Sequence, residues 1–202
     1  MARDSYHHVS RPPAAGAPLI VAAHGTGADE HQFEGLIGEL RPDAGLVAPR
    51  GDVSENGALR FFRRRGEGDY DMDDLAARCT RMAAFIAAHK AAHPGAPIIG
   101  LGYSNGANIL AAVAFEQPEL FDRLVLMHPL IPWTPEPQPR LAGLPVLITA
   151  GRRDPICPLP MSEALRDWFA AQGAEVELVL HDGGHEVAQV ELSALADALA
   201  AA

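Results

Sequence analysis

The 202-residue sequence predicts an α/β fold in three layers, with a mostly parallel sheet between two layers of helices. Short and almost uninterrupted apolar runs recur along the chain, as expected of strands that are buried on both faces. Turn residues and helical patterns separate these runs. No linker is long enough to divide the chain, so residues 1–202 are expected to form one domain, with 1–16 as an irregular N-terminal arm.

Six apolar runs are the predicted strands, because each is rich in Val, Ile, Leu or Ala and is followed by turn residues. They are residues 19–23, 45–48, 98–101, 124–127, 146–149 and 176–180. Several lack polar alternation, which indicates that helices cover both faces of the sheet.

Three helices can be located by their periodicity. The clearest spans 71–93, begins with acidic residues, ends at Pro94-Gly95 and has an apolar stripe of Leu75, Cys79, Met82, Ile86 and His89. A second spans 161–171. The last begins at about residue 186, with a stripe of Val187, Val190, Leu195 and Leu199.

Residues 128–143 are the least regular segment and contain five prolines. Each proline fixes φ and removes a hydrogen-bond donor, so a semi-rigid loop is expected. The segment has room for a loop and not for a lid domain. We therefore expect an open site.

Composition excludes several classes of function. The net charge of −10 argues against nucleic acid or an anionic membrane as a partner. No apolar run approaches the roughly 20 residues that cross a bilayer, and the start of the chain lacks the apolar core of a signal peptide. Two cysteines are too few for a disulfide framework. We expect a cytoplasmic protein without membrane insertion.

The run Gly102-Tyr103-Ser104-Asn105-Gly106 is the most informative motif. It lies between an apolar β-prone segment and a helix-forming segment, which is the context of a nucleophile elbow. Such a turn exposes the serine hydroxyl and directs a helix N-terminus at any charge that forms beside it. The motif predicts Ser104 as a nucleophile.

The segments that follow two later strands supply its partners. Asp154 follows the run 146–149, and His185 follows the run 176–180. Their order along the chain, Ser, Asp, His, is that of an α/β-hydrolase. His185 is preferred over His181, which should still lie in the strand, and Gly183-Gly184 would let it reach the serine. His24 comes too early in the chain and is expected to brace the loop after the first strand.

These residue types fit acyl transfer. A serine hydroxyl needs a base, which neutral His185 can supply, and Asp154 would hold the imidazole in the correct tautomer. The oxyanion needs fixed donors, for which the backbone N–H groups of Asn105 and Thr26 are the candidates.

Together these residues resemble the phospholipase/carboxylesterase family of α/β-hydrolases, and most of all its bacterial carboxylesterase branch of the hydroquinone-associated type. The matching segments are 24–30 (HGTGADE), 49–51 (PRG), 60–64 (RFFRR), 102–106 (GYSNG), 151–158 (GRRDPICP) and 184–185 (GH). The resemblance implies the triad Ser104, Asp154 and His185, the oxyanion donors Thr26 and Asn105, no metal and no cofactor. Thioesterase-like relatives often have glutamine where Asn105 stands, which weakens kinship with protein deacylases.

Four residues are candidates for substrate binding: Arg60, Phe61, Phe62 and Trp133. The segment 60–65 could form a rim for an aromatic or anionic substrate, or an exposed basic loop neutralised by nearby acids. Trp133 could line an acyl or alcohol pocket or pack in the core. Cys157 could be an oxidation-sensitive thiol or a small buried hydrophobe.

The sequence as a whole predicts a serine carboxylesterase that hydrolyses small, uncharged esters through an acyl-enzyme. An acyl-thioesterase or a lysophospholipase would use the same triad. A weakly catalytic ligand-binding protein on a hydrolase scaffold is the alternative from another class. The expected partner is a small-molecule ester, and a homodimer stays open.

Overall fold

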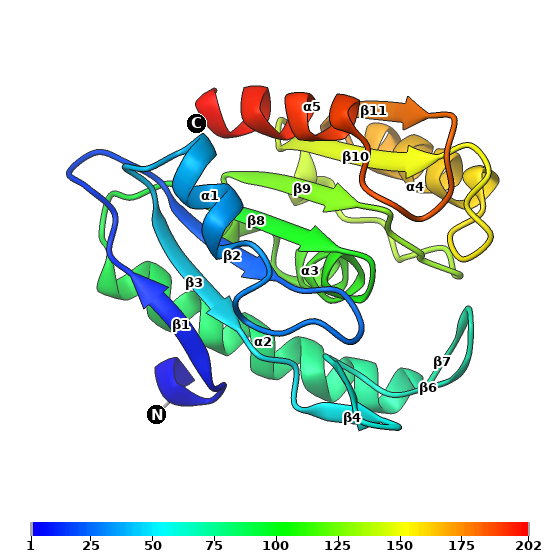
Figure 1. Cartoon of the computed structure of the whole chain (residues 1–202), viewed down its shortest axis with the longest axis horizontal. Coiled ribbons are helices and arrows are strands. Elements are labelled where there is room, and N and C mark those ends of the chain that lie inside the picture. Colours follow the sequence, from blue (N-terminus) through cyan, green and yellow to red (C-terminus); the bar gives the residue numbers. More distant parts are fainter. Residues whose placement is uncertain (1, 202) are drawn as a thin grey trace.

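The computed structural model describes residues 2–201; Met1 and Ala202, the two ends of the predicted domain, lie outside the described residues. Seven strands form one sheet (Figure 1). In spatial order they are β1 (His8–Arg11), β3 (Gly45–Pro49), β2 (Leu19–Ala23), β8 (Ile98–Tyr103), β9 (Arg123–Met127), β10 (Pro145–Gly151) and β11 (Glu175–His181). All neighbours are parallel except β1 and β3. The six predicted strands are confirmed, with small differences at their ends.

The expectation of an irregular arm over 1–16 is wrong for residues 8–11. Strand β1 pairs antiparallel with β3, in the register His8↔Pro49 to Arg11↔Leu46. A short 3-10 helix, η1 (Ala2–Asp4), precedes it. Strand β3 would otherwise leave its outer N–H and C=O groups unpaired, and β1 satisfies them. The run His-Val-Ser-Arg contains a single large apolar residue, so periodicity gave no signal for this strand.

Helices cover both faces of the sheet, which confirms the three-layer prediction (Figure 1). The helices α2 (Met72–Ala92), α3 (Asn105–Glu116) and α4 (Leu159–Ala171) pack with strand residues such as Val21 and Leu124 in the larger core cluster. The helices α1 (Glu34–Leu40) and α5 (Gln189–Ala200) pack with residues of opposite parity, such as Ile20 and Val125. The alternation of side chains along each strand thus feeds two separate cores.

The stripe predicted for α2 is confirmed, since all five of its residues are buried. The prediction for the last helix is wrong at its start. Helix α5 begins at Gln189, and Val187 and Val190 are 40% and 47% exposed, whereas Leu195 and Leu199 are buried. Among the described residues, no helix combines the length and the apolar character needed to cross a bilayer.

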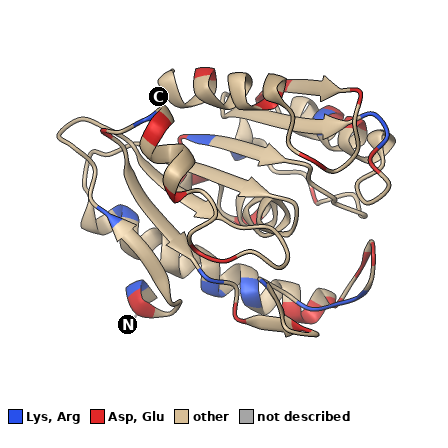
Figure 2. Cartoon of the chain, viewed as in Figure 1, with Lys and Arg blue, Asp and Glu red and all other residues tan. Residues whose placement is uncertain are grey.

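Two regions overhang the carboxyl ends of the strands. Residues 53–70 form two small antiparallel pairs, β4 (Val53–Glu55) with β5 (Ala58–Arg60) and β6 (Arg64–Gly66) with β7 (Asp69–Tyr70). Figure 2 shows basic and acidic residues side by side in this region. Residues 128–144 form the predicted loop between β9 and β10, with one 3-10 turn, η3 (Pro139–Leu141). A further 3-10 turn, η2 (Pro118–Leu120), follows α3.

Candidate active site

Ser104 lies in a sharp turn between β8 and α3. Its φ of 52° and ψ of −116° are unusual for a residue with a side chain, and this backbone conformation is the strained turn expected of a nucleophile elbow. The turn is held by a 2.8 Å hydrogen bond from the Ser104 N–H to the carbonyl oxygen of Met127 at the end of β9. Local sequence and a neighbouring strand together fix the position of the hydroxyl.

The glycines on either side of this turn are required by close backbone contacts. A Cβ atom at Gly106 would lie 2.0 Å from the carbonyl oxygen of Ala23, and one at Gly102 would lie 2.5 Å from the backbone nitrogen of Ala107. Both distances are far below van der Waals contact. Helix α3 can therefore start this close to β2 and β8 only because both positions are glycine.

The three predicted residues form one hydrogen-bonded chain. Ser104 Oγ lies 2.9 Å from His185 Nε2, and His185 Nδ1 lies 2.7 Å from Asp154 Oδ2. Asp154 follows β10 and His185 follows β11, so parallel strands bring their carboxyl ends to one edge of the sheet. The alternative residue His181 is the last residue of β11, as expected.

Asp154 is fixed by four hydrogen bonds. Its Oδ1 accepts from the backbone N–H groups of Ile156 at 2.8 Å and Cys157 at 2.9 Å, and its Oδ2 accepts from two histidines, His185 and His128. Burial raises the pKa of this carboxyl, but these donors outweigh burial and lower the pKa below its ordinary value. The carboxylate is therefore ionised and oriented.

Tyr103 contacts His185 through both its hydroxyl group and its ring. Its hydroxyl donates a 2.5 Å hydrogen bond to the backbone carbonyl oxygen of His185, and its ring packs beside the imidazole with centroids 5.4 Å apart. Burial raises the pKa of Tyr103 to about 12, so the hydroxyl remains a donor. The residue directly before the serine thus positions the histidine loop.

The backbone N–H groups of Thr26 and Asn105 are available for a ligand. Both residues line the cavity beside Ser104, and within residues 2–201 neither N–H donates to a protein acceptor. Asn105 is the first residue of α3, where the first N–H groups have no partner inside the helix. Its side-chain oxygen is occupied, because Asn105 Oδ1 accepts from the Phe61 N–H at 2.8 Å.

His24 braces the loop that carries Thr26, as predicted. Its Nδ1 donates to the carbonyl oxygen of Gly25 at 2.7 Å, and its Nε2 accepts from the Gly51 N–H at 2.9 Å. Burial lowers the pKa of His24, which keeps the ring neutral and able to accept at Nε2. Arg60 adds a second brace through a 2.9 Å bond from its Nη1 to Thr26 Oγ1.

The cavity beside Ser104 has a volume of about 260 Å³. Its wall is apolar at Tyr70, Leu130 and Ile156 and charged at Arg60 and Arg64. The two guanidinium groups are already paired, each with Glu55, at 3.2 and 3.1 Å. The space suits a small, compact ligand.

Two of the four predicted substrate-binding residues, Phe61 and Phe62, have no exposed surface to offer a ligand, and Trp133 does not line the cavity beside Ser104. Phe61 and Phe62 are fully buried in the core, with their rings against His24 and Tyr70. Trp133 lines two other cavities and packs against Phe115. Both phenylalanines lie in the bend that follows β5, and the isolated segment gave no sign that their rings enter the core. Arg60 alone reaches the cavity, and it is a buried brace.

Two residues near the site had no signal in the sequence. His128 and Glu191 are fully buried, and His128 bonds Asp154 Oδ2, the oxygen that His185 also bonds, at 2.9 Å. His128 begins the proline-rich loop and Glu191 lies in α5, and neither belongs to a motif or to an apolar stripe of the sequence. Cys157, which lines the cavity, is also buried; burial raises the pKa of its thiol, and Sγ bonds the His128 carbonyl oxygen.

Comparison with known proteins gives three findings. Residues 69–201 match the dienelactone hydrolase family. The hydrolase MhqD of Bacillus subtilis is 39% identical over 175 residues, which is 86% of this chain and 88% of that protein. Two solved structures superpose with a TM-score of 0.92: Atu2452 of Agrobacterium tumefaciens, of unknown function, at 54% identity over 100% of this chain and 98% of that chain, and a carboxylesterase of Bacillus cereus, at 32% identity over 99% and 96%.

Proposed function

The chain belongs to the dienelactone hydrolase family, and from this premise we propose that it is a serine carboxylesterase that cleaves small carboxylic esters through an acyl-enzyme. It has the α/β-hydrolase fold and is a hydrolase of the carboxylesterase type. One observation carries the finer proposal: the chain of hydrogen bonds from Ser104 Oγ through His185 to Asp154, at 2.9 and 2.7 Å.

Acylation would begin at Ser104. His185 Nε2 is within hydrogen-bond distance of the hydroxyl and would take its proton as Oγ bonds to the ester carbonyl carbon. The same proton would then pass to the alcohol oxygen as the ester bond breaks. Water, activated by His185 in the same way, would release the acid and restore Ser104.

Asp154 would orient the imidazole and stabilise its cation in each transition state. The two unpaired N–H groups, of Thr26 and Asn105, would bind the oxyanion of the tetrahedral intermediate. Removing one such donor typically costs about 3 kcal/mol in the barrier.

The cavity volume supports a short acyl or alcohol group. A space of about 260 Å³ is below the range of roughly 300–1,000 Å³ that is typical of sites for drug-sized ligands. A lysophospholipase or a long-chain acyl-thioesterase would need room for a longer chain. The proposal therefore favours small esters over both alternatives.

Hydrolysis of p-nitrophenyl esters from acetate to decanoate tests the proposal. We expect turnover that is greatest for the short chains and that falls by about 10⁴-fold or more in Ser104→Ala. Ser193→Ala is the matched control, because Ser193 is exposed on α5 and its hydroxyl only bonds the Gln189 carbonyl oxygen. It should keep wild-type turnover.

Turnover that is greatest for the long-chain esters would favour a lysophospholipase or an acyl-thioesterase instead. Wild-type turnover equal to that of Ser104→Ala on every ester would contradict the esterase proposal. A ligand-binding role would then be the remaining candidate.

A further inference from the structure

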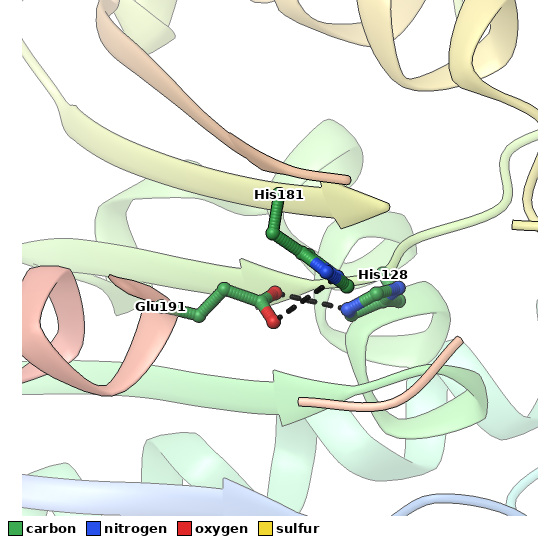
Figure 3. A group of neighbouring side chains, drawn as sticks. All are labelled: His128, His181 and Glu191. Carbon is green, nitrogen blue, oxygen red and sulfur yellow. Dashed lines mark ion pairs between the residues drawn. The ribbon is translucent and has the colours of Figure 1, made fainter. Parts of the chain in front are cut away.

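A second histidine lies buried behind the proposed triad. His128 has no exposed surface, and each of its ring nitrogens faces a buried carboxylate. Nδ1 lies 2.9 Å from Asp154 Oδ2. Nε2 lies 2.9 Å from Glu191 Oε1 in α5, and Figure 3 shows this ion pair. The proposed mechanism uses neither His128 nor Glu191.

The backbone of His128 adopts a conformation that is unfavourable for a residue with a side chain. Its φ of 50° is in the left-handed region, which costs a non-glycine residue of order 1 kcal/mol or more. Its N–H donates to the Thr149 carbonyl oxygen at 2.9 Å, and its own carbonyl oxygen accepts from Cys157 Sγ at 3.2 Å. Strained residues of this kind cluster at functional sites.

The surroundings of His128 favour its doubly protonated form. Nδ1 hydrogen-bonds Asp154 Oδ2, and Nε2 lies 2.9 Å from Glu191 Oε1 in an ion pair. An ionised carboxylate has only acceptor atoms, so it would repel a ring nitrogen without a hydrogen and favours a proton on each. Burial lowers the pKa of His128, but the interactions with Glu191 and Asp154 outweigh it and raise the pKa above its ordinary value. Burial would raise the pKa of Glu191, but the interactions with His128, Thr149 and the Ala188 N–H together outweigh it, and the pKa is lowered.

The same cluster has side chains of the kinds that bind metal ions, but its hydrogen-bond pattern places hydrogens on the nitrogens that would be the ligands. His128 Nε2, His181 Nε2 and a Glu191 oxygen lie within 4.8 Å of one another. His181 Nδ1, however, accepts the Gly183 N–H at 3.0 Å, so His181 Nε2 carries the ring hydrogen and faces Glu191 Oε2 at 3.4 Å. A nitrogen that carries a hydrogen has no lone pair for a metal ion.

We propose that His128 is a positioning residue: a buried imidazolium that fixes the Asp154 carboxylate and offsets part of its charge, so that His185 stays neutral and able to accept a proton. The inference rests on the proposed function, because it assigns His185 the role of base. Glu191 in turn holds the cation in place from the side opposite Asp154.

The sign of the effect follows from the charges around His185. The His128 and His185 rings have centroids 5.0 Å apart, and both bond the same oxygen, Asp154 Oδ2. A cation at His128 therefore opposes a second proton on His185. The titratable groups that face His128 are Asp154 after β10, Glu191 in α5, His181 at the end of β11, His185 after it, Tyr103 in β8 and Cys157 just before α4.

Removal of the cation should therefore let His185 protonate at higher pH. For unit charges about 5 Å apart, an effective dielectric constant of about 20 gives roughly 2 pH units. Relaxation and the protonation of a neighbouring carboxylate reduce this, so we expect about 1 pH unit. The acidic limb of kcat/KM should move upward by the same amount.

Nitrogen-15 NMR of histidine-labelled protein tests the charge directly, without turnover. Of the nine histidines, one should keep both ring hydrogens at pH 8, with two nitrogen signals of similar shift, and this pattern should disappear in His128→Asn. A neutral pattern for His128 at pH 8 would overturn the proposal.

Titration of His185, followed by the same signals, tests the positioning role. His128→Asn keeps a donor near the place of Nδ1 and tolerates the positive φ, but it carries no charge. His128→Asn/Glu191→Gln also removes the carboxylate left without a partner, so it should fold if the single variant does not. Both should raise the midpoint by about 1 pH unit, and an unchanged midpoint would overturn the proposal.

His89→Asn is the matched control, because His89 is equally buried but lies in α2 and contacts Arg3 and Phe85. It should leave the His185 midpoint unchanged. Failure of the esterase proposal would appear instead as equal turnover by wild type and Ser104→Ala, a result that does not depend on the NMR titration.

Discussion

Tyr103→Phe removes one hydroxyl from the site and leaves the aromatic ring in place. The hydroxyl donates a 2.5 Å hydrogen bond to the backbone carbonyl oxygen of His185. The ring packs beside the imidazoles of His185 and His128, with centroids 5.4 and 5.8 Å away, and phenylalanine keeps both contacts. The substitution thus isolates the contribution of a single bond to the placement of His185.

The expected magnitude follows from that bond. A neutral hydrogen bond contributes about 1 kcal/mol, and a carbonyl left without a partner costs roughly 1 kcal/mol more. Residues 182–188 contain no helix or strand, so part of the loss falls on the placement of His185. If about half of this loss, roughly 1 kcal/mol, raises the activation barrier, kcat falls about five-fold. The other half lowers the stability of the fold, and Tm falls by about 2–4 °C.

Steady-state kinetics with p-nitrophenyl acetate and thermal unfolding measure the two parts. KM should change by less than about two-fold, because an effect on the base acts on the reaction step and not on ground-state binding. Tyr6→Phe is the matched control: Tyr6 is buried, and its hydroxyl has no hydrogen-bond partner among residues 2–201. Its kcat should equal that of the wild type.

The reasoning would be refuted if Tyr103→Phe kept wild-type kcat while its Tm fell. That result would make the bond a contributor to stability alone. An equal loss of kcat in Tyr6→Phe would show instead that any buried hydroxyl deletion perturbs the site.

Two further predictions concern stability. Glu30→Gln should lower the free energy of unfolding by about 1 kcal/mol at pH 7 and by nothing near pH 2, since the hydrogen bond from Arg50 lowers the pKa of Glu30 from 4.5 to about 2. The contribution of ionised Glu30 is present above pH 4.5 and is lost as pH falls toward 2. Denaturant unfolding of both proteins at several pH values measures it, and a difference in free energy of unfolding that stays constant from pH 7 to pH 2 would disprove the prediction. Gly106→Ala should cost about 3 kcal/mol, because its Cβ would meet the Ala23 backbone. Gly35→Ala in α1 should stabilise by about 0.5–1 kcal/mol, because nothing lies within 4 Å, and similar Tm values for the two variants would contradict the packing argument.

The parallel strands and the triad order could be predicted because they depend on local signals. Buried parallel strands are continuous apolar runs, and such runs placed β2, β3 and β8 to β11 to within two residues. The carboxyl ends of parallel strands lie at one edge, so residues that follow them were expected to meet. Ser104, Asp154 and His185 do meet there, across 50 and 31 residues of chain.

Other predictions failed because burial depends on partners that are distant in the chain. Because four arginines flank Phe61 and Phe62, the segment 60–65 looks like an exposed rim in the sequence. In the structure the Asn105 side chain accepts a hydrogen bond from the Phe61 N–H, and both rings enter the core. Val190 fits the stripe of the last helix, yet it is exposed. Periodicity indicates that a helix has an apolar face, but it does not indicate which residues of that face another element covers.

The sequence by itself therefore determined the fold class, the elbow at Ser104 and the order of its partners, because backbone geometry and strand periodicity are local properties. Only the tertiary structure decided the surroundings of Asp154. His128 and Glu191 are 63 residues apart in the chain, one at the start of a proline-rich loop and the other in a helix, and neither belongs to a motif. The sheet brings them together in a buried site, where the low dielectric makes each charge depend on the other.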